Sequence, residues 1–266
     1  MSIAIQIQRL QQAKADIKTA LIAKGVTVEE NVTLDNFGTL IESIDSGIIE
    51  GVIPEKTNIS SNEFRNSNFM VVDMPNTVQY IQNNAFSYCY NLINITLSNN
   101  LKVINSGVFS HCTNLRSIII PNSVTVIAGE SFRNCENLRN VILSNNITVI
   151  SSSCFTNCFN LKTISIPDSI ITIEGGAFMN CGLTNIIIPK NVTNIGLNAF
   201  SDCINLINIK INAIQPPTLA GVVFENTNNC PIYVPAESVE TYKTAYRWSK
   251  YASRIQAIPN YADQTL

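Results

Sequence analysis

Residues 109–121 read FSHCTNLRSIIIP, and this phrase recurs with small changes from about Phe64 to Pro235. A fixed period of 20 to 50 residues is typical of a solenoid, in which each repeat stacks on its neighbours and none can bury its core alone. Here the phenylalanine returns at spacings of 22 to 24 residues, at Phe64, Phe86, Phe109, Phe132, Phe155, Phe178, Phe200 and Phe224. We therefore predict a repeat solenoid over residues 59–235.

Each repeat predicts two short extended segments. The first has the pattern Leu-x-x-Ile-x-Ile, as in Leu115, Ile118 and Ile120, and its last three residues alternate inward, outward, inward as in a strand. Pro or Ser ends it, since Pro has no N–H to donate to a ladder. The second has the pattern Val-x-x-Ile, as in Val124 and Ile127. A short helical turn should carry the phenylalanine. The asparagines before the leucine should bond the backbone of adjacent coils and satisfy buried N–H groups of the turns: Asn91, Asn114, Asn137, Asn160 and Asn205.

Six of the eight cysteines lie three residues after a phenylalanine: Cys89, Cys112, Cys135, Cys158, Cys181 and Cys203. We interpret them as small buried side chains, a common use of free cysteine. The alternative is a metal site at Cys154 and Cys158, but it would need at least two further converging ligands, and the sequence shows none. We expect no metal and no cofactor. Reduced thiols favour folding in a reducing compartment.

Residues 1–46 predict a helical module that serves attachment or oligomerisation. Its first helix carries apolar side chains at heptad spacing: Ile3, Ile7, Leu10, Ile17 and Leu21. A module this short seldom folds alone, so it should dock on its own copies, on another protein or on the solenoid end. The alternative role is therefore a cap over the first coil. Residues 47–58, with Gly47, Gly51 and Pro54, predict a linker.

Residues 236–266 predict a C-terminal helical cap. Over residues 236–255 a helix would place Val239, Tyr242, Tyr246 and Ile255 on or near one face. A solenoid must cover its open end, and large aromatic side chains on a terminal helix do this efficiently. A separate binding helix is the alternative.

Charge and hydropathy exclude several classes of function. The formal net charge is −2, which indicates no general affinity for nucleic acid. No apolar run approaches the roughly 18 residues of a membrane span. The segment Met1–Leu10 lacks the basic start and continuous apolar stretch of a signal peptide, which favours assembly in the cytosol.

The repeat pattern Pro-x-x-Val-x-x-Ile-x-x-x-Ala-Phe-x-x-Cys-x-Asn-Leu-x-x-Ile-x-Ile resembles the 23-residue leucine-rich repeat of the BspA-like, treponemal-type group. The ending from Ile232 through Tyr251 and Ile255 is similar to the C-terminal piece of such proteins. The resemblance covers residues 59–258. It implies a leucine-rich-repeat solenoid with short strands in each coil, acting without catalysis in adhesion or host interaction, commonly on a bacterial cell surface.

The N-terminal segment resembles a different group. Ala13–Ile17, Gly25–Val28 and Leu34–Phe37 are similar to segments of phage tail and fibre proteins of gut bacteria. This resemblance implies a solenoid displayed on a virion as a fibre or decoration component. Residues 1–46 would anchor it to an assembly partner, and the same segment could join copies of the chain into a homo-oligomer. Localisation on a virion is the first expectation, and a bacterial cell-surface adhesin is the alternative.

The sequence offers no arrangement typical of an enzyme. His111 is the single histidine, and other repeats hold Tyr88, Asn134, Asn157, Asn180 or Asp202 at its position, which we interpret as a solvated turn. Cys112 belongs to the buried ladder, whereas a nucleophilic thiol needs exposure and a base within reach. We therefore expect a non-enzymatic protein.

Binding should use the outward residues of the first segments, which form three columns along the stack. One column holds the cations Arg116, Arg139 and Lys162. Stacked like charges repel, so their partner should be acidic, either a protein or a glycan on a host surface. The alternative is solubilising charge beside isoleucines retained for strand propensity. The full predicted surface is Arg116, Arg139, Lys162, Ile119, Ile142, Ile187, Asn140 and Asn185.

Overall fold

The computed structural model describes residues 50–259 of the 266-residue chain. The chain divides into two compact units, residues 1–49 and 50–266, and every described residue belongs to the second. The helices predicted for residues 1–46, with Ile3, Ile7, Leu10, Ile17 and Leu21, lie outside the described residues.

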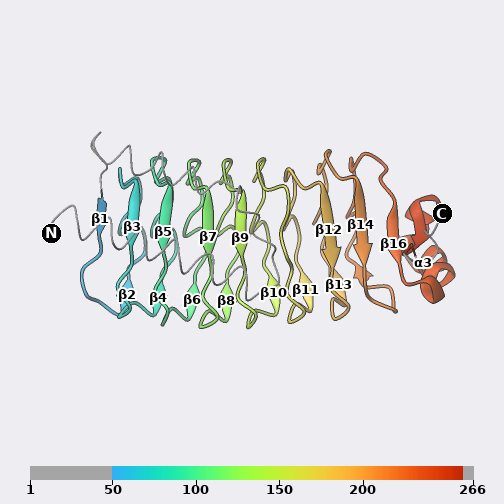
Figure 1. Cartoon of the computed structure of the whole chain (residues 1–266), viewed down its shortest axis with the longest axis horizontal. Coiled ribbons are helices and arrows are strands. Elements are labelled where there is room, and N and C mark those ends of the chain that lie inside the picture. Colours follow the sequence, from blue (N-terminus) through green and yellow to red (C-terminus); the bar gives the residue numbers. More distant parts are fainter. Residues whose placement is uncertain (1–49, 260–266) are drawn as a thin grey trace, which may run out of the picture. The chain divides into compact units, whose positions relative to one another are not determined.

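Residues 50–259 form a solenoid whose coils each contribute short parallel strands to two rows (Figure 1). The first row holds the Leu-x-x-Ile-x-Ile segments, with other short strands at its ends: β1 (Glu50–Val52), β3 (Val71–Asp73), β5 (Asn94–Thr96), β7 (Ser117–Ile119), β9 (Asn140–Ile142), β12 (Asn185–Ile188), β14 (Asn208–Ile211), β16 (Ile232–Val234) and β17 (Ile255–Ala257). The Val-x-x-Ile segments supply the second: β2 (Asn58–Ile59), β4 (Tyr80–Ile81), β6 (Val103–Ile104), β8 (Val126–Ile127), β10 (Val149–Ile150), β11 (Thr172–Ile173), β13 (Asn194–Ile195) and β15 (Thr218–Leu219).

Strand register confirms the predicted alternation of side chains. In the pair β7–β9, Ile118 lies opposite Val141 and Ile119 opposite Ile142, so equivalent residues of successive coils stack in columns. Ile118 and Ile120 are 2% exposed, while Ile119 between them is only half-buried. The apolar arm residues therefore form the continuous core that the repeat predicts.

The phenylalanines form the centre of this core as one stacked ladder. From Phe64 to Phe224, successive ring centroids lie 5.2 to 5.7 Å apart and neighbouring ring planes differ by 4° to 22°. Rings from Phe86 to Phe200 are fully buried. Offset stacking at this separation is a favourable geometry for aromatic rings, and it matches the spacing between coils that the strand hydrogen bonds impose.

The cysteine ladder is buried as predicted, and the structure shows why the residue is cysteine. Each thiol donates a hydrogen bond to the carbonyl of the phenylalanine one coil earlier, with Sγ–O distances of 3.0 to 3.3 Å. Cys135 thus bonds the Phe109 carbonyl, and Cys158 bonds that of Phe132. An alanine at this position would leave part of the core volume unfilled. It would also remove the hydrogen bond that the buried phenylalanine carbonyl accepts from the thiol.

The turn around each phenylalanine is not the short helix that we predicted. Its N–H groups alternate: Cys112 bonds the Phe109 carbonyl within the coil, whereas Phe109 and His111 bond carbonyls of the next coil. From Phe64 to Phe200 a left-handed residue lies two positions before and two positions after each phenylalanine, whereas Phe224 has one only after it, at Asn226. Those residues have φ between 53° and 65°: Asn62, Asn66, Asn84, Tyr88, Gly107, His111, Glu130, Asn134, Ser153, Asn157, Gly176, Asn180, Asn198, Asp202 and Asn226.

One coil of the first row has no strand, and the hydrogen-bonded sheet is also broken between β5 and β7. Residues 161–167 were expected to form a strand, and their Ile164 and Ile166 do point inward, but no strand is present there between β9 and β12. The strandless coil adjoins the shortened segment Cys181–Gly182–Leu183, in one of the two coils where successive phenylalanines are 22 residues apart. A Cβ on Gly182 would lie 2.0 Å from the Phe159 carbonyl oxygen, so the shorter coil can approach its neighbour only because this residue is glycine.

The solenoid begins earlier than predicted. Residues 50–52, within the segment interpreted as a linker, form β1 and pair with β3, with Gly51 opposite Val72. A Cβ on Gly51 would lie 2.7 Å from the ring of Phe69. The glycine therefore provides close packing rather than linker flexibility, and the structure corrects the linker boundary to before Glu50.

The C-terminal cap is confirmed, but it is not one helix. It consists of the 3-10 turn η2 (Ala236–Ser238), the helix α3 (Val239–Thr244) and the 3-10 helix η3 (Trp248–Arg254). Arg247 adopts a left-handed conformation, φ 66°, which breaks the predicted continuous helix. As a result Tyr246, expected on the inner face, is 82% exposed.

Aromatic side chains of the cap close the phenylalanine ladder. Trp248 and Tyr251 pack on Phe224 with centroid distances of 6.0 and 5.5 Å. Two buried rings of the cap also form hydrogen bonds to the last coil. Trp248 Nε1 donates to the Pro217 carbonyl at 2.7 Å, and the Tyr242 hydroxyl donates to the Ala213 carbonyl at 2.8 Å. The break at Arg247 thus lets both ends of the cap reach the last coil.

We expect Phe132→Ala to lower the free energy of unfolding by about 3–5 kcal/mol, because it empties one site in a stacked core that cannot collapse without shifting adjacent coils. Phe159→Ala is the matched control, since Phe159 is 46% exposed and its loss should change stability by about 0.5 kcal/mol or less. Urea unfolding of the full chain measures both. A loss below about 1 kcal/mol for Phe132→Ala would show that the ladder is not the core.

Candidate functional site

The predicted binding surface lies on the outward side of β7 and β9. These strands bring Ile119 and Ile142 into direct register. Just before them, Arg139 donates its backbone N–H to the Arg116 carbonyl at 2.9 Å, so the two arginines occupy adjacent rungs. Both arginines and Asn140 are exposed, and the two isoleucines are half-buried. We name this group of five residues the β7–β9 face.

The arginines of the β7–β9 face have no charge partner in the described part of the chain. Ion pairs among residues 50–259 join Lys56–Glu63, Arg133–Glu130, Lys243–Glu240 and Lys250–Glu225, and none includes Arg116, Arg139 or Lys162. Adjacent rungs lie about 4.8 Å apart. Two like charges held at such spacing repel, and an acidic ligand would relieve that repulsion.

The structure separates the remaining predicted residues from this face. Lys162 lies within the strandless segment 161–167, and Asn185 and Ile187 lie beyond it on β12. There the Asn208 amide donates to Asn185 Oδ1 at 2.7 Å, while Ile187 lies opposite Lys210. The Thr184 N–H still donates to the Lys162 carbonyl at 2.9 Å, so the coils remain stacked through the strandless segment, and the full binding surface stays a prediction.

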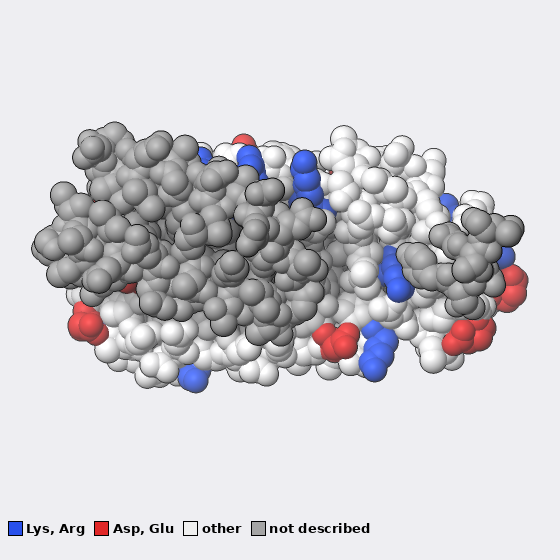
Figure 2. All heavy atoms as spheres, viewed as in Figure 1, with Lys and Arg blue, Asp and Glu red and all other residues white. Residues whose placement is uncertain are grey.

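Charge is sparse over the rest of the visible surface. In the part of the view that Figure 2 leaves uncovered, Lys, Arg, Asp and Glu side chains stand singly or in small groups among uncharged atoms. Paired arginines on neighbouring rungs therefore contrast with a mostly uncharged surface.

The predicted asparagine ladder is present, although it serves different groups than we expected. Asn114 donates its side-chain amide to the Tyr90 carbonyl at 2.7 Å, and Asn160 donates to the Glu136 carbonyl at 2.9 Å. These amides therefore satisfy carbonyls of the preceding coil rather than buried N–H groups.

Sequence reasoning missed a second side-chain ladder, at the position two residues after the phenylalanine. Asn180 donates to Asn157 at 3.0 Å, Asn157 donates to Asn134 at 2.6 Å, and Asn134 lies 2.7 Å from His111 Nε2. Beyond it the His111 ring stacks on Tyr88 at 4.3 Å. The position is half-buried and hydrogen-bonded, which corrects our interpretation of it as a solvated turn. Recurrent asparagine was the available signal, because asparagine tolerates the left-handed conformation.

This ladder determines the state of the single histidine. The Asn134 amide carbonyl already accepts from Asn157, so its Nδ2 must donate to His111 Nε2, which requires a neutral imidazole. Partial burial, followed by the nearby Arg133 charge, lowers the pKa of His111, while Glu136 and Glu130 oppose this shift. A lowered pKa agrees with the hydrogen-bond direction.

None of the neighbouring thiols is arranged to act with this histidine. Cys112 is fully buried and its Sγ donates to the Phe86 carbonyl. Burial also raises the pKa of the Cys135 and Cys154 thiols, which disfavours the reactive thiolate. Within residues 50–259, no three His, Cys, Asp or Glu side chains gather as a metal site would require. The described helices include none with the length and apolar character to cross a bilayer.

The fold and these ladders define a leucine-rich-repeat solenoid, and comparison identifies its family. The family model described as "BspA type Leucine rich repeat region", in six copies, matches residues 57–183 and 171–261. The chain therefore belongs to the BspA-type leucine-rich-repeat family. No catalytic family is indicated, and members of leucine-rich-repeat families typically act by binding.

Solved structures show the same architecture. A leucine-rich cell surface protein from Faecalibacterium prausnitzii is 29% identical, with a TM-score of 0.57, over 69% of this chain and 60% of that protein. A leucine-rich repeat protein of T. pallidum is 22% identical, with a TM-score of 0.56, over 74% of this chain and 92% of that one, which is a likeness of fold alone. No curated protein matches the chain. The resemblance of residues 1–46 to phage proteins is supported by none of these comparisons and stays a prediction.

We expect the free energy of unfolding to fall as the pH is lowered through about 6.5, the ordinary pKa of histidine, because the unfolded chain binds a proton to His111 before the folded chain does. Other groups titrate nearby, so the measurement is the difference between the parent and His111→Asn, which matches the neighbouring rungs. The free energy of unfolding of the parent minus that of the variant should be constant above about pH 7.5. It should fall below pH 6.5, because only the parent loses stability through His111. A difference independent of pH would refute the neutral, ladder-bonded imidazole.

Proposed function

We propose that this chain is a non-enzymatic cell-surface protein that binds an acidic partner, a protein or glycan of a host surface, through the β7–β9 face. Arg116 and Arg139, which lie on adjacent rungs and have no ion-pair partner among residues 50–259, carry the proposal. Their mutual repulsion costs stability that no described neighbour recovers, and a surface selected only for solubility would distribute its charges with both signs interspersed.

The isoleucines beside the arginines, and the arginine side chain itself, suit such a contact. Ile119 and Ile142 are half-buried and in register, so they present a small apolar strip between rungs. Arginine is favoured at interfaces because its planar guanidinium binds carboxylate, phosphate or sulfate groups with two parallel hydrogen bonds. The strip would add buried apolar area around these charge-assisted bonds.

Cell-surface display rests on similarity. The F. prausnitzii relative is described as a cell surface protein, and this chain spans 60% of its length, so its location is carried over here as part of the proposal. Residues 1–46 would supply the attachment or oligomerisation function that their heptad pattern predicts. Display on a virion would rest only on the resemblance of that same segment to phage proteins.

The test is binding of the labelled full chain to mucin, an acidic glycoprotein layer, and to epithelial cells. We expect the double substitution Arg116→Glu, Arg139→Glu to reduce binding at least about tenfold, since loss of two charge-assisted contacts exceeds the 1.4 kcal/mol that a tenfold change requires. Both side chains are exposed, so the melting temperature should change little.

Lys102→Glu with Lys190→Glu is the matched control, because both lysines are exposed and the change in net charge is the same. This control should bind like the parent. Equal weakening by both pairs would show a general charge effect, and unaltered binding by the arginine pair would place the site elsewhere on the solenoid.

A further inference from the structure

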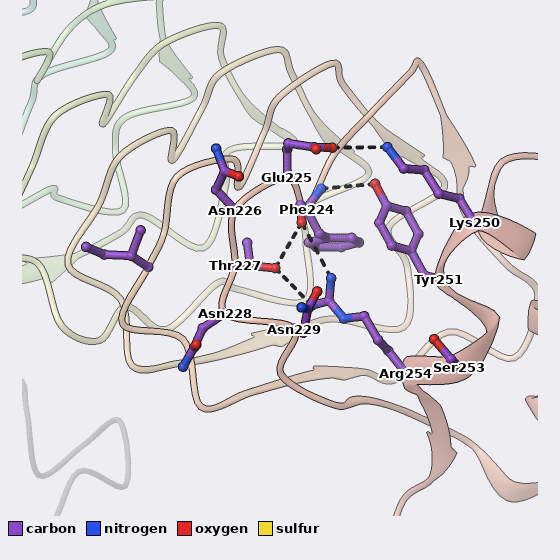
Figure 3. Close-up of a pocket in the computed structure, with 11 residues that line it drawn as sticks. Phe224, Glu225, Asn226, Thr227, Asn228, Asn229, Lys250, Tyr251, Ser253 and Arg254 are labelled. Atoms are coloured by element: carbon purple, nitrogen blue, oxygen red, sulfur yellow. Dashed lines mark hydrogen bonds and ion pairs between the residues drawn. The ribbon is translucent and has the colours of Figure 1, made fainter.

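The C-terminal end of the solenoid holds a cleft of about 760 Å³ between the last phenylalanine turn and the cap (Figure 3). One wall is the loop Glu225–Asn229, and the other is the η3 segment that carries Lys250, Ser253 and Arg254. Neither the cap prediction nor the β7–β9 face uses this cleft.

The loop wall presents three asparagines in left-handed conformations: Asn226, Asn228 and Asn229 have φ of 53°, 53° and 50°. All three side chains are exposed. Asn226 donates to Asp202 at 2.8 Å. The amides of Asn228 and Asn229, like the Ser253 hydroxyl, make no hydrogen bond to another side chain or backbone group of the described residues. Each amide therefore offers a donor and an acceptor to a ligand.

The charged side chains of the cleft already have hydrogen-bond partners, although those of Arg254 are all uncharged groups. Lys250 pairs with Glu225 at 3.0 Å. The Arg254 guanidinium donates to the Cys230 carbonyl at 2.8 Å and to Thr227 Oγ1 at 2.9 Å. An anionic ligand would have to break one of these interactions, so the cleft favours a ligand without net charge.

The floor is apolar and held in place. Phe224 and Tyr251, 2% and 4% exposed, lie beneath the opening. The Tyr251 hydroxyl accepts the backbone N–H of Val223 at 3.1 Å, which fixes its ring. At the rim Ile204 is 64% exposed. The cleft is open to solvent, and its volume lies within the 300 to 1,000 Å³ that small-molecule sites have.

We propose that this cleft binds a neutral saccharide. Sugar hydroxyls donate and accept hydrogen bonds at once, which matches the paired donors and acceptors of Asn228, Asn229 and Ser253. The apolar C–H face of a pyranose would cover Ile204. A charged ligand would instead have to compete with the Glu225–Lys250 pair or with the hydrogen bonds of Arg254, whereas a neutral sugar leaves both in place.

The test uses Trp248, the single tryptophan of the chain. Its ring lies 6.0 Å from Phe224 and 6.4 Å from Tyr251, so ligand contact with the cleft floor should alter its fluorescence. The full chain is first screened on an array of neutral and acidic oligosaccharides. The strongest neutral binder is then titrated while Trp248 emission is recorded.

We expect Asn228→Gly with Asn229→Gly to weaken that binding at least tenfold, with the melting temperature within a few degrees of the parent. Glycine removes the amides but keeps the left-handed backbone available. Asn62→Gly with Asn66→Gly is the matched control, because these residues have φ of 59° and 62° in the first described phenylalanine turn. It should bind like the parent.

Three outcomes would overturn the proposal: no neutral oligosaccharide bound on the array, binding that leaves Trp248 emission unchanged, or equal affinity of the Asn228/Asn229 variant and the parent. The result is independent of the proposed surface function. Arg116→Glu with Arg139→Glu should leave saccharide binding unaltered, so failure of one proposal is distinguishable from failure of the other.

Discussion

The stacking of one phenylalanine on the next is the contact on which the other features depend. Strand hydrogen bonds set the coil spacing, and at that spacing the rings meet at 5.2 to 5.7 Å. Each ring needs a turn that points it inward, and from Phe64 to Phe200 that turn has a left-handed residue on both sides. Cysteine then bonds the phenylalanine carbonyl of the coil before it. Core, turn and ladder are therefore one repeated constraint, and a change at one rung is transmitted to its neighbours.

This constraint explains where binding can occur. Interior positions are occupied at every level, so variation is tolerated only at outward strand positions, at irregular coils and at the two ends. The β7–β9 face belongs to the first group, since Arg116 and Arg139 point away from the core. The cleft beside Asn228 and Asn229 belongs to the last group, because the final turn must meet a cap rather than another coil. Family membership fixes the scaffold but identifies neither ligand.

Several misreadings of the sequence have a common physical cause. Gly51 looked like a linker residue, and it is a close-packing position against Phe69. Residues 236–255 had helical spacing, yet Trp248 and Tyr242 reach carbonyls on the last coil only if the helix breaks at Arg247. In each case a local pattern was consistent with two conformations. The contact that selects between them comes from a residue far away in the sequence, so local analysis could not find it.

The sequence alone determined the solenoid, its period, the buried ladders of Phe, Cys, Leu and Ile, and the outward position of Arg116 and Arg139. It could do so because every repeat faces the same neighbours, and a pattern seen eight times reports a shared environment. Tertiary structure alone decided the strandless coil beside Gly182, the neutral state of His111, the broken cap and the cleft at Asn228 and Asn229. These features occur once each, where a coil meets something other than its own copy, and single contacts of that kind leave no periodic signal.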